Sequence, residues 1–305
     1  MSVYPLIWVN DVACNSVDNG FGLHPDHPPR VVGAPTMVSV SVPGRDGELN
    51  TPQGATLPSL FVVTLRVRGS GATVDDQYAH VEQIISTWGR VIRAPRIVLK
   101  QQVAASGVGS VLYAEARLAT PPTRERESGV LVHEKFTMTF QVTGAFWSDQ
   151  PPGTPSFTFS QVPAVSGTKY VVDSVASTAP LLDAQIRITG PAVNPRYTDY
   201  VTGDWVQYNG TVASGTQLRL DLAKFKAWSS SSWVSNDWST AGTDVSGSMF
   251  IGGNAQLYTP TMVRLTPGLL VSAGAATLTG IEGTLTGTGF TSATRLEVRG
   301  RRAHG

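Results

Sequence analysis

One amphipathic helix constrains the possible folds of this chain more than any other feature. Between Thr73 and Arg93, apolar residues recur at steps of three and four, which places on one helical stripe Val74, Tyr78, Val81, Ile85, Trp88 and Ile92. Thr73 is a suitable N-cap, and Pro95 prevents the helix from continuing. Because a single helix cannot bury its stripe alone, it must lie on a sheet made by the strands around it. The sequence therefore predicts a module of strands plus one helix in the first half of the chain.

Strands are predicted on both sides of this helix. Apolar and polar residues alternate in segments 61–68, 112–118 and 130–142, as they do in half-buried strands. Between the last two of these segments, residues 121–129 read PPTRERESG. We predict a charged loop there.

An earlier alternating segment, 38–42, is predicted to be half of a hairpin. It is followed by the sequence PGRDG, in which Asp46-Gly47 suits a turn that needs positive φ. We therefore expect the strand to reverse and to continue through Glu48 and Leu49.

A domain boundary is predicted after the last of these strands. Residues 144–153 read GAFWSDQPPG, and the consecutive prolines Pro151 and Pro152 cannot donate to a strand ladder and favour an extended connector. With 305 residues, the chain is also long enough for two domains. We therefore expect an N-terminal domain at 1–147 and a C-terminal domain at 148–305.

Beyond the boundary, the sequence predicts strands only. Short strand-like segments recur near the spacing typical of a sandwich or barrel, and no segment has the pattern of a long helix. Asn209-Gly210 is the clearest hairpin signal in the chain. The predicted fold class is therefore mainly β, with one α-helix at about Val74–Ile92.

Composition and motifs argue against several classes of function. A net charge of +1 gives no electrostatic argument for wrapping nucleic acid or for lying on an anionic membrane. The single cysteine, Cys14, excludes an intrachain disulfide and permits assembly in a reducing cytoplasm. The first residues lack the basic region and apolar run of a signal peptide, so we expect a soluble, unexported chain. No catalytic motif is present, and we predict no catalytic residue, no cofactor and no metal site.

A serine-rich stretch with three tryptophans has two interpretations. Trp228, Trp233 and Trp238 could stack on sugar rings or contact a partner, because indoles are flat and largely apolar. The more ordinary interpretation is that they pack into the domain or cover its edge.

Other polar residues suggest sites less strongly. His24, Asp26 and His27 fall short of a closed set of metal ligands, and we expect a solvated loop there. A glycosidase would need two carboxylates at a fixed separation, which the sequence alone cannot show. Carboxylates scattered over the second half are Asp204, Asp221, Asp237, Asp244 and Glu282.

The order of motifs along the chain resembles that of the distal tail proteins of long-tailed phages, and more narrowly that of the minor tail proteins of phages infecting actinobacteria. A PGRDG turn after an alternating strand is followed by one helix and by a strand closing on GAFW. The all-β half then contains IRITGPAVNP at 186–195 and GTQLRLD at 215–221. The resemblance extends over nearly the whole chain.

This resemblance implies a structural virion protein. Its N-terminal belt domain, a β-sandwich or split barrel plus the helix, would form a ring, and its C-terminal domain would be a galectin-like β-sandwich. Six copies would close into a homo-hexamer between the tail tube protein and the baseplate hub, tail-associated lysin or other minor tail proteins. DNA would pass transiently through the lumen. Such a protein would be assembled in the host cytoplasm and would not be embedded in a membrane.

The resemblance carries no enzymatic residues. By analogy, candidate ring or partner contacts are Arg45 and Asp46 in the turn, and Arg124 and Arg126 in the charged segment. The tryptophans keep open an alternative function, a carbohydrate-binding adsorption module of the tail tip. A third hypothesis, a glycan hydrolase, is disfavoured by the missing export signal.

Overall fold

The chain folds into two compact units, Met1–Pro152 and Gly153–His304. The structure, a computed structural model, describes residues 6–16, 19–28, 39–41, 48–50, 60–103, 110–127, 132–143, 146–175, 177–181, 183–234, 238, 242–253, 263, 265–272 and 275–304. Both units are built mainly of strands, and α1 (Val74–Val91) is the one α-helix of these described residues. The predicted fold class, mainly β with a single helix, is confirmed.

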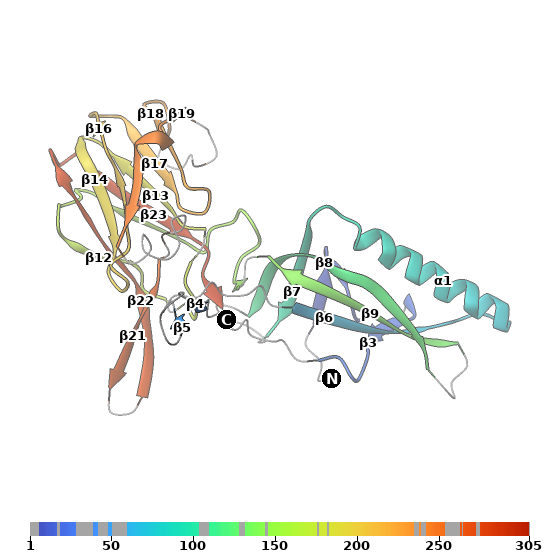
Figure 1. Ribbon diagram of the computed structural model, residues 1–305. Helices are drawn as coiled ribbons and strands as arrows, with labels where there is room; N and C mark the ends of the chain where they lie inside the picture. The colour runs from blue at the N-terminus through green and yellow to red at the C-terminus, as the bar shows by residue number, and fades with distance from the viewer. Residues whose placement is uncertain are drawn as a thin grey trace. The chain divides into compact units, whose positions relative to one another are not determined.

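The first unit is an antiparallel sheet with α1 lying along it (Figure 1). In order across the sheet, its strands are β2 (Val12–Ala13), β1 (Ile7–Val9), β7 (Ile97–Gln102), β8 (Val111–Arg126), β9 (His133–Val142), β6 (Leu60–Arg68) and β3 (Phe21–Leu23). A short strand, β10 (Trp147–Ser148), pairs with β8. A separate hairpin joins β4 (Ser39–Ser41) to β5 (Glu48–Asn50), as predicted, and its turn residues 42–47 lie outside the described residues.

Helix α1 is capped and buried largely as the sequence predicts. The Thr73 hydroxyl accepts from the Asp76 backbone N–H at 3.1 Å, and the Asp76 carboxylate accepts from the Thr73 N–H at 3.0 Å, which makes a capping box. The buried face consists of Val81, Ile84 and Trp88, all in the core of this unit. The predicted stripe was wrong at its first position, because Val74 in the first turn is 48% exposed.

The charged segment after the second predicted strand is not a loop. Strand β8 continues through it to Arg126, which pairs with Glu134 of β9. The register shifts between Leu118 and Thr120 and again between Thr120 and Thr123. These irregularities accommodate Pro121 and Pro122, which have no N–H to donate. The strand therefore continues through residues that the sequence analysis assigned to a loop.

The second unit consists of two antiparallel sheets (Figure 1). The six-stranded sheet has the order β11 (Phe157–Gln161), β23 (Arg295–Gly300), β13 (Gln185–Thr189), β17 (Gln217–Asp221), β18 (Lys226–Ser230) and β19 (Thr243–Asp244). The seven-stranded sheet has the main order β12 (Lys169–Asp173), β22 (Ala275–Thr288), β14 (Ala192–Asp199), β15 (Trp205–Tyr208) and β20 (Met249–Gly252). In that sheet, β16 (Thr211–Val212) pairs with β14 and β21 (Pro267–Ser272) with β22; β24 (Ala303–His304) and the 3₁₀ turn η2 (Ser246–Ser248) complete the unit.

The Asn209-Gly210 turn does not close the predicted hairpin. The strands it joins, β15 and β16, both pair with β14 instead of with each other. The reason lies in β14, where Asn194 has a left-handed φ of 49° and interrupts the ladder. Its backbone N–H donates to the Gly210 carbonyl at 2.8 Å, and its side-chain oxygen accepts from the Gly210 N–H at 2.9 Å.

Replacing Thr73 by alanine should destabilise the first unit by about 1 kcal/mol, because the substitution removes the hydroxyl that satisfies an N–H at the helix start. The matched variant Thr73→Ser keeps that hydroxyl and should stay close to the wild type. Urea denaturation of the full chain, followed by circular dichroism at the helix band, measures the difference. Equal stability of the two variants would contradict the capping argument.

A buried carboxylate fixes the turn after β14. Asp199 is fully buried, and its oxygens accept from the backbone N–H groups of Val201 at 2.9 Å, Thr202 at 3.3 Å and Thr266 at 2.8 Å. Burial raises the pKa of Asp199 to about 6, and the charge of Asp204 adds to the effect, while the three N–H groups oppose it. Its ionisation therefore favours the unfolded chain.

The contribution of Asp199 to the free energy of unfolding should fall as pH rises from about 4 to about 6. The folded pKa lies above the unfolded value of about 3.9, so the cost of ionisation reaches roughly 3 kcal/mol at neutral pH. The stability difference between the wild type and Asp199→Asn should shift by that amount across this range. A pH-independent difference for Asp199→Asn would refute the assignment.

Candidate functional site on the outer face of the six-stranded sheet

The three central strands of the six-stranded sheet, β13, β17 and β23, are buried on both faces. One face carries the apolar core, with fully buried Ile186, Ile188, Leu218, Leu220, Leu296 and Val298. The opposite face, which we call the outer face, carries Arg187, Arg219 and Glu297, of which 0%, 5% and 5% are exposed. Strand register places Arg187 directly between the other two. Charged side chains that are this deeply buried require partners.

The central partner of Arg187 is Glu297. The guanidinium donates from Nε to Oε2 at 2.7 Å and from Nη2 to Oε1 at 2.8 Å, which is a bidentate pair. Burying two charges carries a large desolvation cost, which such geometry can offset only while both members are present. The two strands β13 and β23 are therefore linked by side chains as well as by backbone hydrogen bonds.

The tryptophans cover this charged row. The guanidinium carbon of Arg187 lies 4.6 Å from the Trp238 ring centre, and that of Arg219 lies 4.8 Å from Trp228 and 5.0 Å from Trp233. Polar contacts fix the same stretch: Gln217 donates to the Trp233 carbonyl, Arg187 to that of Val234 and Arg219 to that of Trp238. Cation–π stacking in a desolvated setting is worth up to about 2 kcal/mol per contact.

This packing bears on the two interpretations of the tryptophans. Trp233 and Trp238 are only 5% and 6% exposed, and all three indoles have an arginine over the ring. A sugar ring needs an open indole face on which to stack. The geometry therefore agrees with the packing interpretation and offers little surface to a glycan.

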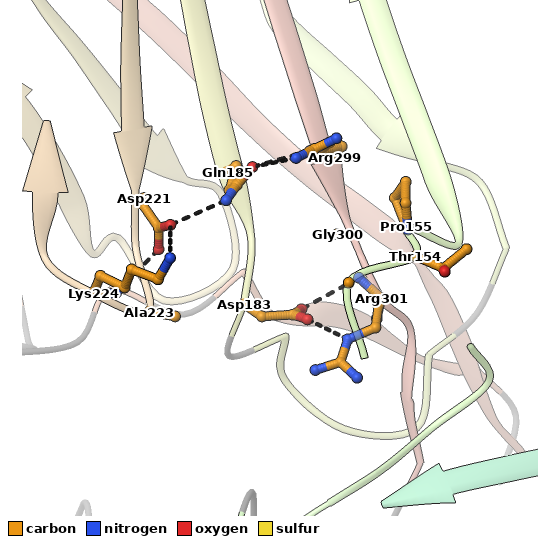
Figure 2. Close-up of a pocket in the computed structure, with 11 residues that line it drawn as sticks. Thr154, Pro155, Asp183, Gln185, Asp221, Ala223, Lys224, Arg299, Gly300 and Arg301 are labelled. Carbon is orange, nitrogen blue, oxygen red and sulfur yellow. Dashed lines mark hydrogen bonds and ion pairs between the residues drawn. The ribbon is translucent and has the colours of Figure 1, made fainter. Parts of the chain in front are cut away.

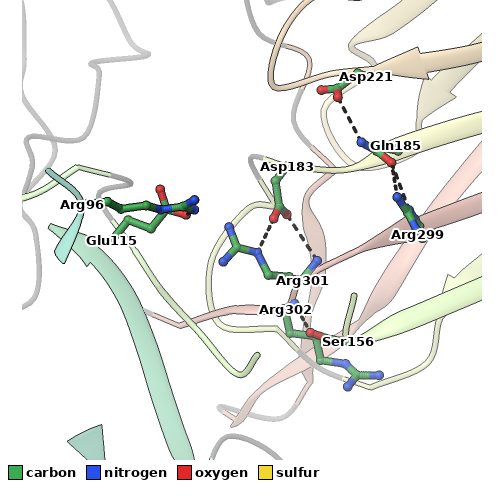
Figure 3. Close-up of polar contacts among 9 residues, drawn as sticks. All are labelled: Arg96, Glu115, Ser156, Asp183, Gln185, Asp221, Arg299, Arg301 and Arg302. Atoms are coloured by element: carbon green, nitrogen blue, oxygen red, sulfur yellow. Dashed lines mark hydrogen bonds and ion pairs between the residues drawn. The ribbon is translucent and has the colours of Figure 1, made fainter. Parts of the chain in front are cut away.

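A neutral amide links the next row of the same face. Gln185 Oε1 accepts from Arg299 Nε at 3.0 Å and Nη2 at 2.7 Å, and Gln185 Nε2 donates to Asp221 Oδ2 at 3.0 Å (Figure 3). Arg299 also stacks on Trp238, with its guanidinium carbon 4.4 Å from the ring centre. Burial lowers the pKa of Arg299 to about 10, and repulsion from Arg219 and Arg187 adds to the shift.

A cavity of about 150 Å³ opens in front of this row (Figure 2). Its rim includes Lys224, which approaches Asp221 at 3.7 Å, and Arg301, which is paired with Asp183. Residues 153–155 form another part of its lining.

In the first unit, the two arginines that the sequence analysis proposes as ring or partner contacts, Arg124 and Arg126, contact residues of the same chain. Arg124 binds Glu82 of α1 at 2.6 Å and Glu134 of β9 at 2.9 Å, and the hydrogen bond with Glu82 raises the pKa of Arg124. The guanidinium carbon of Arg126 lies 5.2 Å from the ring centre of Tyr78. Both arginines therefore tie the far end of β8 to the helix. The other predicted contacts, Arg45 and Asp46, lie outside the described residues.

The histidine segment differs from the solvated loop that the sequence predicts. His24 is only 8% exposed, and its Nε2 lies 2.7 Å from Glu127 Oε1, while Arg66 donates to the other oxygen of Glu127 at 2.7 Å. The extension of β8 explains the difference, because it brings Glu127 beside this segment. Among the described residues, no group of three metal-binding side chains is present.

Comparisons by sequence find no match, since no protein-family model and no curated protein is similar to this chain. Comparison by structure finds similar proteins. The SPP1 Dit protein (gp 19.1), described as a paradigm of the hub adsorption apparatus of phages infecting Gram-positive bacteria, matches with a TM-score of 0.57 and 11% identity. The match covers 97% of this chain and 98% of that protein. The chain has the fold of a phage distal tail protein.

The resemblance that the order of motifs predicts is thus confirmed at the level of the distal-tail fold. A chain of the phage p2 baseplate, in its activated conformation with Sr, is also similar over 94% of this chain and its own full length, with 10% identity and a TM-score of 0.36. That score is too low for an argument from fold. Among the described residues, no helix has the length and apolar character that a membrane crossing requires.

Replacing Glu297 by glutamine should destabilise the second unit by roughly 3–5 kcal/mol, because the buried Arg187 loses the carboxylate that binds it through two hydrogen bonds. The double variant Arg187→Met with Glu297→Met removes both charges and should recover most of that loss. Urea denaturation followed by tryptophan fluorescence measures both. If the double variant were as unstable as the single one, packing and not charge would explain the pair.

Proposed function

We propose that this chain is a structural virion protein, a distal tail subunit that joins the phage tail tube to the tail tip. The observation that carries the proposal is the end-to-end structural match with the SPP1 Dit protein. The match spans both units, so it does not rest on one common β-module. The function would be mechanical, with no enzymatic step.

In this proposal six copies form a closed ring around a channel for DNA. Closed symmetry fixes the channel diameter, and each subunit covers strand edges of its neighbour. The first unit would supply the ring contacts. In its sheet, β2 and β3 are the outermost strands, and in the sequence Arg45 and Asp46 lie between β4 and β5. Arg124 and Arg126 would support these contacts indirectly, because they hold the C-terminal part of β8 against α1.

The proposed partners are the tail tube protein on one side of the ring and a baseplate hub, a tail-associated lysin or other minor tail proteins on the other. Assembly would take place in the host cytoplasm. The second unit would brace the tip as a galectin-like sandwich. Its outer-face carboxylates already have partners, since Glu297 is bound by Arg187 and Asp221 by Gln185, which disfavours a hydrolase role for them.

Two measurements test the proposal. Native mass spectrometry of the full chain over a concentration series should show a hexamer, and electron microscopy of virions labelled with antibody against this chain should show label at the distal end of the tail tube. Because a ring can depend on the tail for its formation, the labelled virion decides. Label along the tube or at the head, with pre-immune serum as the control, would refute the proposal.

A further inference from the structure

The cavity in front of the Gln185 row has an unequal distribution of charge. Each of its two carboxylates has a cationic partner: Asp183 binds Arg301, and Asp221 is approached by Lys224 (Figure 2). Arg299, the third cation, donates to the neutral amide of Gln185 and forms no ion pair with any described carboxylate. The lining therefore carries one more positive than negative charge.

Arg299 is partly removed from water, so keeping its charge without a bound anion has a desolvation cost. Its guanidinium donates to the Gln185 amide and stacks on the Trp238 ring, on the side of the sheet that also buries Arg187. A partly desolvated cation in such a place gains from a nearby anion. Burial, together with repulsion from Arg219 and Arg187, lowers the pKa of Arg299 to about 10, although the charges of Asp221 and Asp183 oppose the shift.

We infer that this cavity is a binding site for a single carboxylate group, which would lie against Arg299 at the centre and Arg301 or Lys224 at the rim. Guanidinium groups bind carboxylates with charge-assisted, directional hydrogen bonds. The site is independent of the proposed ring. It would be available on any folded copy of the second unit, because all the lining residues belong to that unit.

Size and charge favour a carboxylate over other anions and over sugars. A volume of about 150 Å³ corresponds to about five waters at roughly 30 Å³ each, which suits a small group. Asp183 and Asp221 on the lining would repel a doubly charged phosphate more than a singly charged carboxylate. The lining contains no aromatic residue, so a sugar ring would have no stacking surface.

The test is a titration of the full chain with sodium acetate, a singly charged carboxylate, at constant ionic strength, followed by tryptophan fluorescence and thermal unfolding. Constant ionic strength removes the general effect of salt screening. We expect a saturable response in the wild type and, in Arg299→Gln, binding weakened by about tenfold or more, as for loss of a charge-assisted hydrogen bond. Lys169→Gln removes one cation from the seven-stranded sheet and should bind like the wild type.

A second variant keeps the test decisive if Arg299→Gln folds poorly. Asp183→Asn removes a repulsive charge from the rim and frees Arg301, so acetate should bind several-fold more tightly. No saturable response in the wild type, an unchanged affinity in a folded Arg299→Gln, or no gain in Asp183→Asn would overturn the proposal.

The carboxylate could be a free ion or a side chain of a neighbouring protein, and a parallel titration with N-acetyl-glutamate amide distinguishes them. Tighter binding of this blocked glutamate than of acetate would assign the site to an acidic side chain, and the reverse to a free ion. Either result supports the carboxylate site. Failure here would leave virion labelling unaffected, so the two proposals can fail separately.

Discussion

The burial of Arg187 is the constraint on which the second unit depends. A guanidinium with no exposed surface is stable only if Glu297 neutralises it and if something excludes water from the pair. The tryptophans exclude water from the pair. The arginines that they cover donate hydrogen bonds in return to the backbone carbonyls of Val234 and Trp238. Sheet, ion pair and covering segment therefore stabilise one another, and the six-stranded sheet acquires a third layer without a helix.

In the first unit, helix α1 covers the sheet and buries Val81, Ile84 and Trp88 in the core. This helix was predictable because the pattern is local: a period of 3.6, a Thr73 cap and a proline stop lie within one short stretch. The strand beyond Leu118 was not predictable, because consecutive prolines normally end strands and only the partner strand β9 shows that bulges accommodate them. Local signals were sufficient for the helix, and pairing across the sheet decided the strand.

The outer-face site had a sequence signal that periodicity alone could not interpret. Three strands share one pattern, a charge between two apolar residues, in Ile186-Arg187-Ile188, Leu218-Arg219-Leu220 and Leu296-Glu297-Val298. Alternation assigns each charge to the face opposite the core, which is correct. Whether that face is open to water depends on register and on the distant tryptophans, and neither is local. The sequence alone therefore leaves two interpretations of the tryptophans, and their arginine partners favour packing.

The structural match at 11% identity indicates where the constraint on such a chain lies. The function of an enzyme depends on a few reacting side chains. The function of an assembly subunit depends on strand order, on the sheet edges that contact neighbours and on the rigidity of its units. The carboxylates of the second unit follow this logic, because those on the outer face are held by arginine, lysine or amide partners and serve to link strands. Arg299 departs from it. Its hydrogen bonds go to the neutral Gln185 amide and it forms no ion pair with a described carboxylate, and the proposed carboxylate site is built on this difference from the other charged groups of the face.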